Sequence, residues 1–261
     1  MSSKDLDLYR QEFGHFRETM QEYLAKNEDY LLNDPTGLKL SRSLLDQFVT
    51  GWVGMAQRSI GYDVNYYAMS WFMEMMMGPA VTTVTAAVLA GIYDFPPNAL
   101  RELFEGIELA YALDTKPDMK GLTMGRKFRI LEGCAKPDSR ERKPLIEYTA
   151  KSFDQPTKGM MSKFYHELSD FAHAPGYVAR GFKSGRLSDH FPPSFREIME
   201  KPAMKDYVPE RWLIPTFELR RLQEDDATVD QMILLLETFS SLAKLIFDKW
   251  ESIVAGRGQS G

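Results

Sequence analysis

Several features that define whole classes of protein are missing from this 261-residue chain. It has a single cysteine, Cys134, so an intramolecular disulfide cannot form and a disulfide-stabilised scaffold is excluded. Sustained alternation of apolar and polar residues is absent, as are Asn-Gly and Asp-Gly turns, which argues against a β-sheet protein. The chain also lacks a glycine-rich phosphate loop, a Gly-x-Ser-x-Gly elbow and a Cys-x-x-Cys pair. Common nucleotide-binding, hydrolase and redox motifs are therefore missing.

An excess of basic charge is missing as well. Lys and Arg total 32, Asp and Glu total 37, and the formal net charge is −5. This balance argues against a strongly basic nucleic-acid binder but leaves room for a local basic patch. The first five residues include an acid and no apolar run, so we expect no secretory signal peptide. Together with the single cysteine, this predicts a cytoplasmic protein.

Helical periodicity is present throughout the chain. In two long segments, 4–32 and 226–254, apolar residues recur at alternating steps of three and four. Asn33-Asp34-Pro35 is expected to end the first helix, because the residue before a proline leaves the helical region. Shorter helices are expected at 38–60, with Leu44, Leu45 and Phe48 on one face, at 66–77, kinked or restarted at Gly78-Pro79, and at 121–134 and 139–152, with others around 100–111 and 156–173. We therefore predict a single all-α domain over 1–261, a multi-helix bundle with long N- and C-terminal heptad helices. A proline-rich, irregular loop insertion is expected at 175–225.

The longest uncharged stretch, 75–93, has 19 residues and is long enough to span a bilayer. It contains Gly78-Pro79 and three threonines, and acidic residues bracket it with no nearby base to set an orientation. We therefore expect a buried central helix and no membrane span. The preceding methionine- and aromatic-rich segment, 66–77, could alternatively line a small-ligand pocket, although such stripes are more often core.

A basic stretch covers residues 116–143, which hold nine basic and four acidic residues. Such a surface could bind the phosphates of a nucleic acid, and a solvated basic surface is the alternative interpretation. Three further basic residues follow in the expected loop. The candidate anion- or nucleic-acid-binding residues are Arg126, Lys127, Arg129, Arg140, Arg142, Lys143, Arg180, Lys183 and Arg186.

A separate polar group falls on one expected helix. His166, Asp170 and His173 project within about 60° of one another, opposite the apolar stripe of that helix. Two imidazoles and a carboxylate are suitable zinc or iron ligands, and the histidines could instead donate to a phosphate. A solvated helix face is the alternative. We expect no resident cofactor.

Two stretches carry a resemblance to known proteins. They are Leu100-Arg101-Glu102-Leu103-Phe104-Glu105, continuing to Ala110-Tyr111, and Tyr165-His166-Glu167-Leu168-Ser169-Asp170-Phe171-Ala172-His173. Together they resemble HEPN-like and abortive-infection-type helical proteins of prokaryotes. The resemblance implies an all-α bundle from a defence or toxin–antitoxin context, sometimes acting on RNA. The Arg-then-His spacing of HEPN ribonucleases matches only at Arg10 and His15, outside both stretches, so ribonuclease activity is not carried over.

The sequence therefore predicts a non-catalytic interaction or accessory protein of a prokaryotic defence or nucleic-acid-associated system. The heptad helices are expected to pair with each other, to bind a protein partner or to form a homodimer, and RNA or DNA is a further candidate partner. The alternative is a HEPN-type or metal-dependent RNA-processing enzyme that uses His166, Asp170 and His173.

Overall fold

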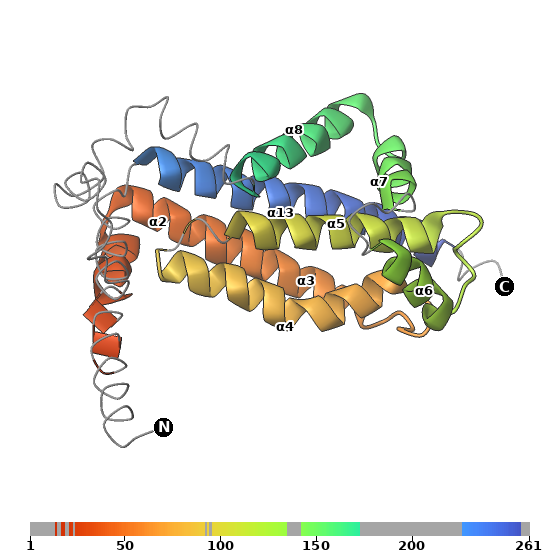
Figure 1. Ribbon diagram of the computed structural model, residues 1–261, viewed down its shortest axis with the longest axis horizontal. Coiled ribbons are helices and arrows are strands. Elements are labelled where there is room, and N and C mark those ends of the chain that lie inside the picture. The colour runs from red at the N-terminus through yellow and green to blue at the C-terminus, as the bar shows by residue number, and fades with distance from the viewer. Residues whose placement is uncertain are drawn as a thin grey trace, which may run out of the picture.

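The computed structural model describes residues 24–91, 96–134, 142–172 and 226–256, besides the single positions 14, 17, 18, 21, 22 and 93 (Figure 1). These residues form helices and turns without a strand, which confirms the predicted all-α bundle. The elements are α2 (Pro35–Arg42), η1 (Ser43–Val49), α3 (Thr50–Ser59), α4 (Ala68–Leu89), α5 (Pro96–Thr115), α6 (Met124–Cys134), α7 (Arg142–Lys151), α8 (Gln155–Ala172) and α13 (Asp226–Ala255).

The N-terminal helix ends at the predicted proline. Asp34 adopts an extended backbone conformation ahead of Pro35, because the residue before a proline avoids the helical region. Its carboxylate then caps α2 by accepting hydrogen bonds from the backbone N–H groups of Thr36 at 2.8 Å and Gly37 at 3.2 Å. A Cβ atom at Gly37 would collide with the backbone carbonyl of Tyr30. This glycine therefore allows the close approach of the two helices.

The central helix of the bundle is α5, which packs against α4, α13, α7 and α8 (Figure 1). The expectation that 75–93 forms the buried central helix is therefore wrong. In the second half of α4 only one face is buried, at Val81, Val84 and Val88, while Met75 and Leu89 are 56% and 44% exposed. The physical reason is position, since α4 packs against α3, η1 and α5 on one side of the bundle.

Helix α4 bends by 45° between Met75 and Gly78, which confirms the kink expected at Gly78-Pro79. The hydroxyl of Thr83 donates to the carbonyl of Pro79 at 2.7 Å and helps to satisfy the backbone there. Within the described ranges, no single helix has the length and apolar character needed to cross a membrane. The two halves of α4 meet that test only when they are taken together as a bent pair.

The heptad stripe of α13 is buried in the core of the chain. Its buried members are Val229, Met232, Leu236, Phe239, Ala243, Ile246 and Trp250. The helix packs against α2, η1, α3, α5 and α8, so this stripe is not free to pair with a second copy. Most of the N-terminal heptad stripe and the whole predicted insertion at 175–225 lie outside the described residues.

Candidate functional site

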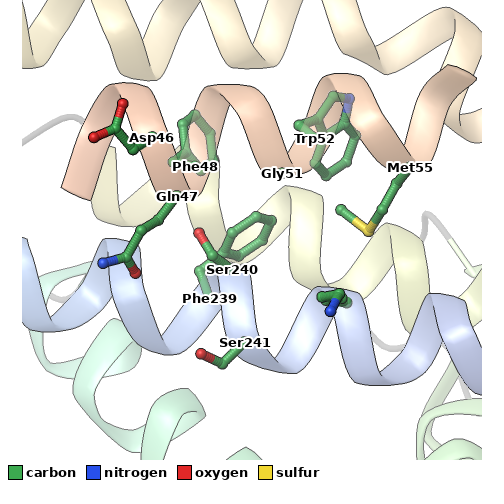
Figure 2. Close-up of a pocket in the computed structure, with 10 residues that line it drawn as sticks. Asp46, Gln47, Phe48, Gly51, Trp52, Met55, Phe239, Ser240 and Ser241 are labelled. Atoms are coloured by element: carbon green, nitrogen blue, oxygen red, sulfur yellow. The ribbon is translucent and has the colours of Figure 1, made fainter. Parts of the chain in front are cut away.

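An open groove lies where η1 and the start of α3 face the middle of α13 (Figure 2). Its volume is about 260 Å³. The residues that line it are Asp46, Gln47, Phe48, Gly51, Trp52, Met55, Phe239, Ser240, Ser241 and Lys244. We call this set the η1–α13 groove. Its floor is apolar and its rim is polar.

The floor of the η1–α13 groove is an edge of the hydrophobic core. The rings of Phe48 and Phe239 lie 5.5 Å apart between centroids, and Trp52 stacks on Phe239 at 6.1 Å. Met55 completes the floor, and all four side chains are at most 4% exposed. Because packed core side chains are held in single rotamers, this floor is preorganised.

The rim of the groove carries opposite charges on its two walls. Asp46 belongs to η1 and Lys244 to α13, and both are exposed. The Lys244 ammonium has a distant partner in Asp248, at 4.0 Å. At one side of the groove, the side-chain amide of Gln47 donates to the carboxylate of Glu237 at 3.3 Å and so joins the two walls.

The wall that carries Asp46 is a π-helix, which is rare and is found frequently at functional sites. The hydroxyl of Thr50 donates to the carbonyl of Leu45, five residues earlier, at 2.8 Å. The wider turn keeps Leu44, Phe48 and Trp52 on the buried face at intervals of four residues. Leu45 was expected on that face, but it is 47% exposed. The α-helical period used for the expectation does not apply to this segment.

Gly51 leaves the groove uncovered. A Cβ atom at Gly51 would meet no atom within 4 Å, so the space above the floor is open. Gly54, one turn further along α3, has the same free space but does not line the groove. A glycine inside a helix costs about 1 kcal/mol relative to alanine. The pair therefore offers a matched test of the groove, because substitutions at both sites share the same helix.

The prediction that segment 66–77 lines a small-ligand pocket is wrong for this groove, since none of the ten lining residues comes from it. Met69, Phe72 and Met73 are instead buried between the helices. The edge of the Phe72 ring faces the ring of Trp52 at 6.0 Å. The methionine- and aromatic-rich stripe therefore forms core, as its spacing more often indicates.

The predicted anion-binding residues lie in different environments. Arg126 and Arg129 on α6 and Lys143 on α7 are exposed. Arg142 is half-buried and forms an ion pair with Glu105 of α5. Binding of a nucleic acid by the exposed residues stays a prediction. Outside the described residues lie Arg140, Arg180, Lys183 and Arg186.

Lys127 is not part of a basic surface, because its side chain is fully buried. Its ammonium lies 2.6 Å from the carboxylate of Asp114 on α5. The same carboxylate accepts hydrogen bonds from the Trp250 indole at 2.9 Å and from the backbone N–H groups of Ala68 and Met69 at 2.8 and 3.0 Å. Asp114 therefore caps α4 from another helix and joins it to α5, α6 and α13.

A second buried carboxyl, Glu108, lies on the same central helix. The hydroxyl of Tyr165 on α8 donates to its Oε2, while its Oε1 has no hydrogen-bond partner among the described residues. Burial raises the pKa of Glu108 to about 8, and the hydrogen bond from Tyr165 opposes part of this effect. Burial and the neighbouring carboxyl together raise the pKa of Tyr165. At neutral pH, Glu108 is therefore protonated.

Of the candidate metal ligands, His166 is exposed on α8, between the ion-paired residues Lys163 and Glu167. The side chain of Asp170 and all of His173 lie outside the described residues. Within the described part of the chain, no three His, Cys, Asp or Glu side chains are placed to hold a metal ion. Metal binding by this set stays a prediction.

Comparison of the chain with protein families, with curated proteins and with solved structures finds no match. The HEPN-like resemblance therefore stays a prediction. Sequence reasoning found neither the groove nor the two buried carboxyls. The available signal was the placement of Glu108 and Asp114 in a helix that is otherwise largely apolar, since a charged residue there needs an internal partner.

Proposed function

We propose that this chain is a non-catalytic interaction protein that binds an apolar side chain of a partner protein in the η1–α13 groove. The observation that carries the proposal is the opening at Gly51 above a floor of packed aromatic rings. A site that holds an apolar anchor inside a polar rim is the usual arrangement at the centre of a protein interface.

The size of the groove favours a single side chain. An apolar cavity of about 150 Å³ is large enough to bind benzene, and sites for drug-sized molecules run from about 300 to 1,000 Å³. The η1–α13 groove, at about 260 Å³, lies between these values. It is therefore matched to one large apolar group, such as the side chain of Trp, Phe or Leu.

The surroundings of the groove favour an amphipathic helix as the partner element. Leu234, Ser241 and Leu245 fall on one face of α13, and the two leucines are 46% and 44% exposed. This edge runs along the groove over three turns, as expected for a helix laid into a groove. Asp46 and Lys244 on opposite walls would pair with a basic and an acidic residue that flank the partner's anchor.

The chemistry of the lining residues favours binding over catalysis. The floor carries no ionisable group, and the two charged residues of the rim are exposed and lie on separate walls. A general acid or base needs a proton donor or acceptor within hydrogen-bond reach of the reacting group. The buried acid Glu108 contacts Tyr165 inside the bundle and does not line the groove. The association with defence or nucleic acids stays a prediction from the resemblance.

The groove can be tested with a minimal probe. N-acetyl-tryptophanamide should cause a saturable shift of the Met55 methyl resonance in methyl-labelled protein, with an affinity in the millimolar range, as one anchor supplies only about 4 kcal/mol. The Met55→Leu variant assigns the resonance. N-acetyl-glycinamide, which has no side chain, should cause no shift.

Two glycine variants make the test specific to the groove. Gly51→Leu should fill the open space and abolish the shift, whereas Gly54→Leu should preserve it, because that site lies outside the groove. A Met55 resonance that does not respond to the probe, or that responds equally in Gly51→Leu, would contradict the proposal.

A further inference from the structure

The interface between α8 and α5 joins apolar packing to one buried polar contact. The rings of Phe164 and Tyr165 on α8 lie 5.1 and 5.3 Å from the ring of Phe104 on α5. Leu168 of α8 is also fully buried. Within this interface the Tyr165 hydroxyl donates to the carboxyl of Glu108, which is 0% exposed. The Glu108 carboxyl therefore lies away from water, while Tyr165 on α8 is partly exposed.

The charged groups of the neighbouring helices do not neutralise Glu108. On α5 itself, Glu105 lies one turn before it and forms ion pairs with Arg101 of α5 and Arg142 of α7. Both arginines are therefore engaged by Glu105. From α7, the hydroxyl of Thr149 donates at 2.8 Å to the backbone carbonyl of Glu108 and not to its carboxyl.

The other described neighbours of this part of α5 that the contacts below name are apolar or phenolic. Helix α13 brings the ring of Phe239 against Phe104 at 6.5 Å. Helix α4 brings Phe72 so close to Gly106 that a Cβ atom there would overlap the ring. Tyr111 follows Glu108 by one turn on α5 and is buried. Among the described residues a charge on Glu108 would thus have no cation of its own, and its side chain is 0% exposed, so the buried carboxyl holds its proton.

We propose that Glu108 and Tyr165 form a proton-dependent latch, in which the protonated carboxyl holds α8 against α5 and loss of the proton accompanies release of α8. In the released state Glu108 reaches water, where a glutamate has its ordinary acidity. The phenol of Tyr165 keeps its proton in both states and serves as the hydrogen-bond donor.

The direction of the pH effect follows from the two states. The pKa of Glu108 is about 8 when α8 is docked and has its ordinary value, near 4.5, when the carboxyl is solvated. Between these values each opening event releases one proton, so the opening constant rises about tenfold for each pH unit. Above pH 8 the carboxyl is ionised in both states and the constant levels off. The latch is therefore tightest under acidic conditions.

Amide hydrogen exchange of the full chain at pH 5.5 and 7.5, corrected for intrinsic exchange rates, tests the latch. In the wild type, the opening constant of the α8 amides should rise about a hundredfold between the two pH values. Glu108→Gln should remove the rise, because the amide cannot ionise. The variant keeps every other titratable residue of the chain, so a rise caused by another group would persist.

The Tyr165→Phe variant separates the latch from general packing. It should weaken the hold on α8 at both pH values and keep the pH-dependent rise, since burial of Glu108 is unchanged. The amides of α4 are an internal reference for unfolding of the whole bundle, and a smaller rise there supports a local latch. The proposal is overturned if the α8 amides show no rise, if the rise persists in Glu108→Gln, or if the α4 amides rise equally.

Discussion

Two positions on α5, its middle and its C-terminal end, bury the same functional group in opposite ways. At the C-terminal end, Asp114 receives an ammonium, an indole N–H and two backbone N–H groups. Near the middle, Glu108 receives a single phenol hydroxyl, and one of its oxygens has no partner among the described residues. The difference shows that the partners supplied by other helices decide whether a buried carboxyl is a fixed structural tie or a proton-sensitive group.

The largest effect is expected when the tie at Asp114 is broken. Asp114→Ala should lower the free energy of unfolding by about 3–5 kcal/mol, because Lys127 would become an unpaired charge in the core. Chemical denaturation monitored by circular dichroism measures this loss. Adding Lys127→Met to Asp114→Ala removes the stranded charge, so the double variant should recover part of the loss. A single variant as stable as the wild type would show that the ion pair is not buried.

The second largest effect is expected from Glu108→Gln, which should raise the free energy of unfolding at high pH where Asp114→Ala lowers it. The pKa of this carboxyl is raised on folding, so its contribution is fully present below its ordinary value and is lost as the pH rises through about 8. Between pH 5 and pH 8 the free energy of unfolding of the wild type should fall by on the order of 3 kcal/mol, and that of Glu108→Gln should not show this fall. The variant should therefore be the more stable protein at pH 8. If the free energies of unfolding of the wild type and of Glu108→Gln change in parallel with pH across this range, the contrast with Asp114 is refuted.

A smaller effect is expected from the indole that supports Asp114. Trp250→Phe keeps most of the buried ring but removes the N–H donor, which lies 2.9 Å from the carboxylate. Loss of a hydrogen bond to a charged group costs about 1.5–3 kcal/mol. Urea denaturation with an unchanged m-value would assign the loss to the native contact. A loss of unfolding free energy below about 0.5 kcal/mol would mean that the other donors to Asp114 stabilise its carboxylate without the indole.

The smallest effect is expected from the single donor at Glu108. Tyr165→Phe deletes one hydroxyl and should cost about 0.5–1.5 kcal/mol at pH 6. This loss should be smaller than that of Trp250→Phe, because the acceptor Glu108 is a neutral acid at this pH whereas Asp114 is ion-paired. The reverse order of the two losses in thermal unfolding at pH 6 would remove the distinction between the two carboxyls.

Local sequence patterns predicted most helix positions well. The stop at Asp34 and Pro35 and the kink near Pro79 follow from properties of the proline ring. The stripe of α13 follows from its three- and four-residue spacing, and the structure buries it as expected. Two expectations failed, each for its own reason. Leu45 is exposed because it lies in a π-helix, to which the α-helical period does not apply. The exposure of one face in the second half of α4 depends on which helices surround it, and periodicity within a helix carries no such information.

By itself, then, the sequence determined that the described part of this chain is helical, that the first helix ends before Pro35 and that α4 bends near Pro79, because these choices depend on residues within one or two turns. The groove and the two carboxyl environments were decided only by the tertiary structure. Trp250 reaches Asp114 across 136 residues, and Ser43 reaches Glu237 across 194. From the sequence alone, a charged residue such as Lys127 is expected on the surface. Only the position of Asp114 in space makes the burial of the Lys127 side chain stable.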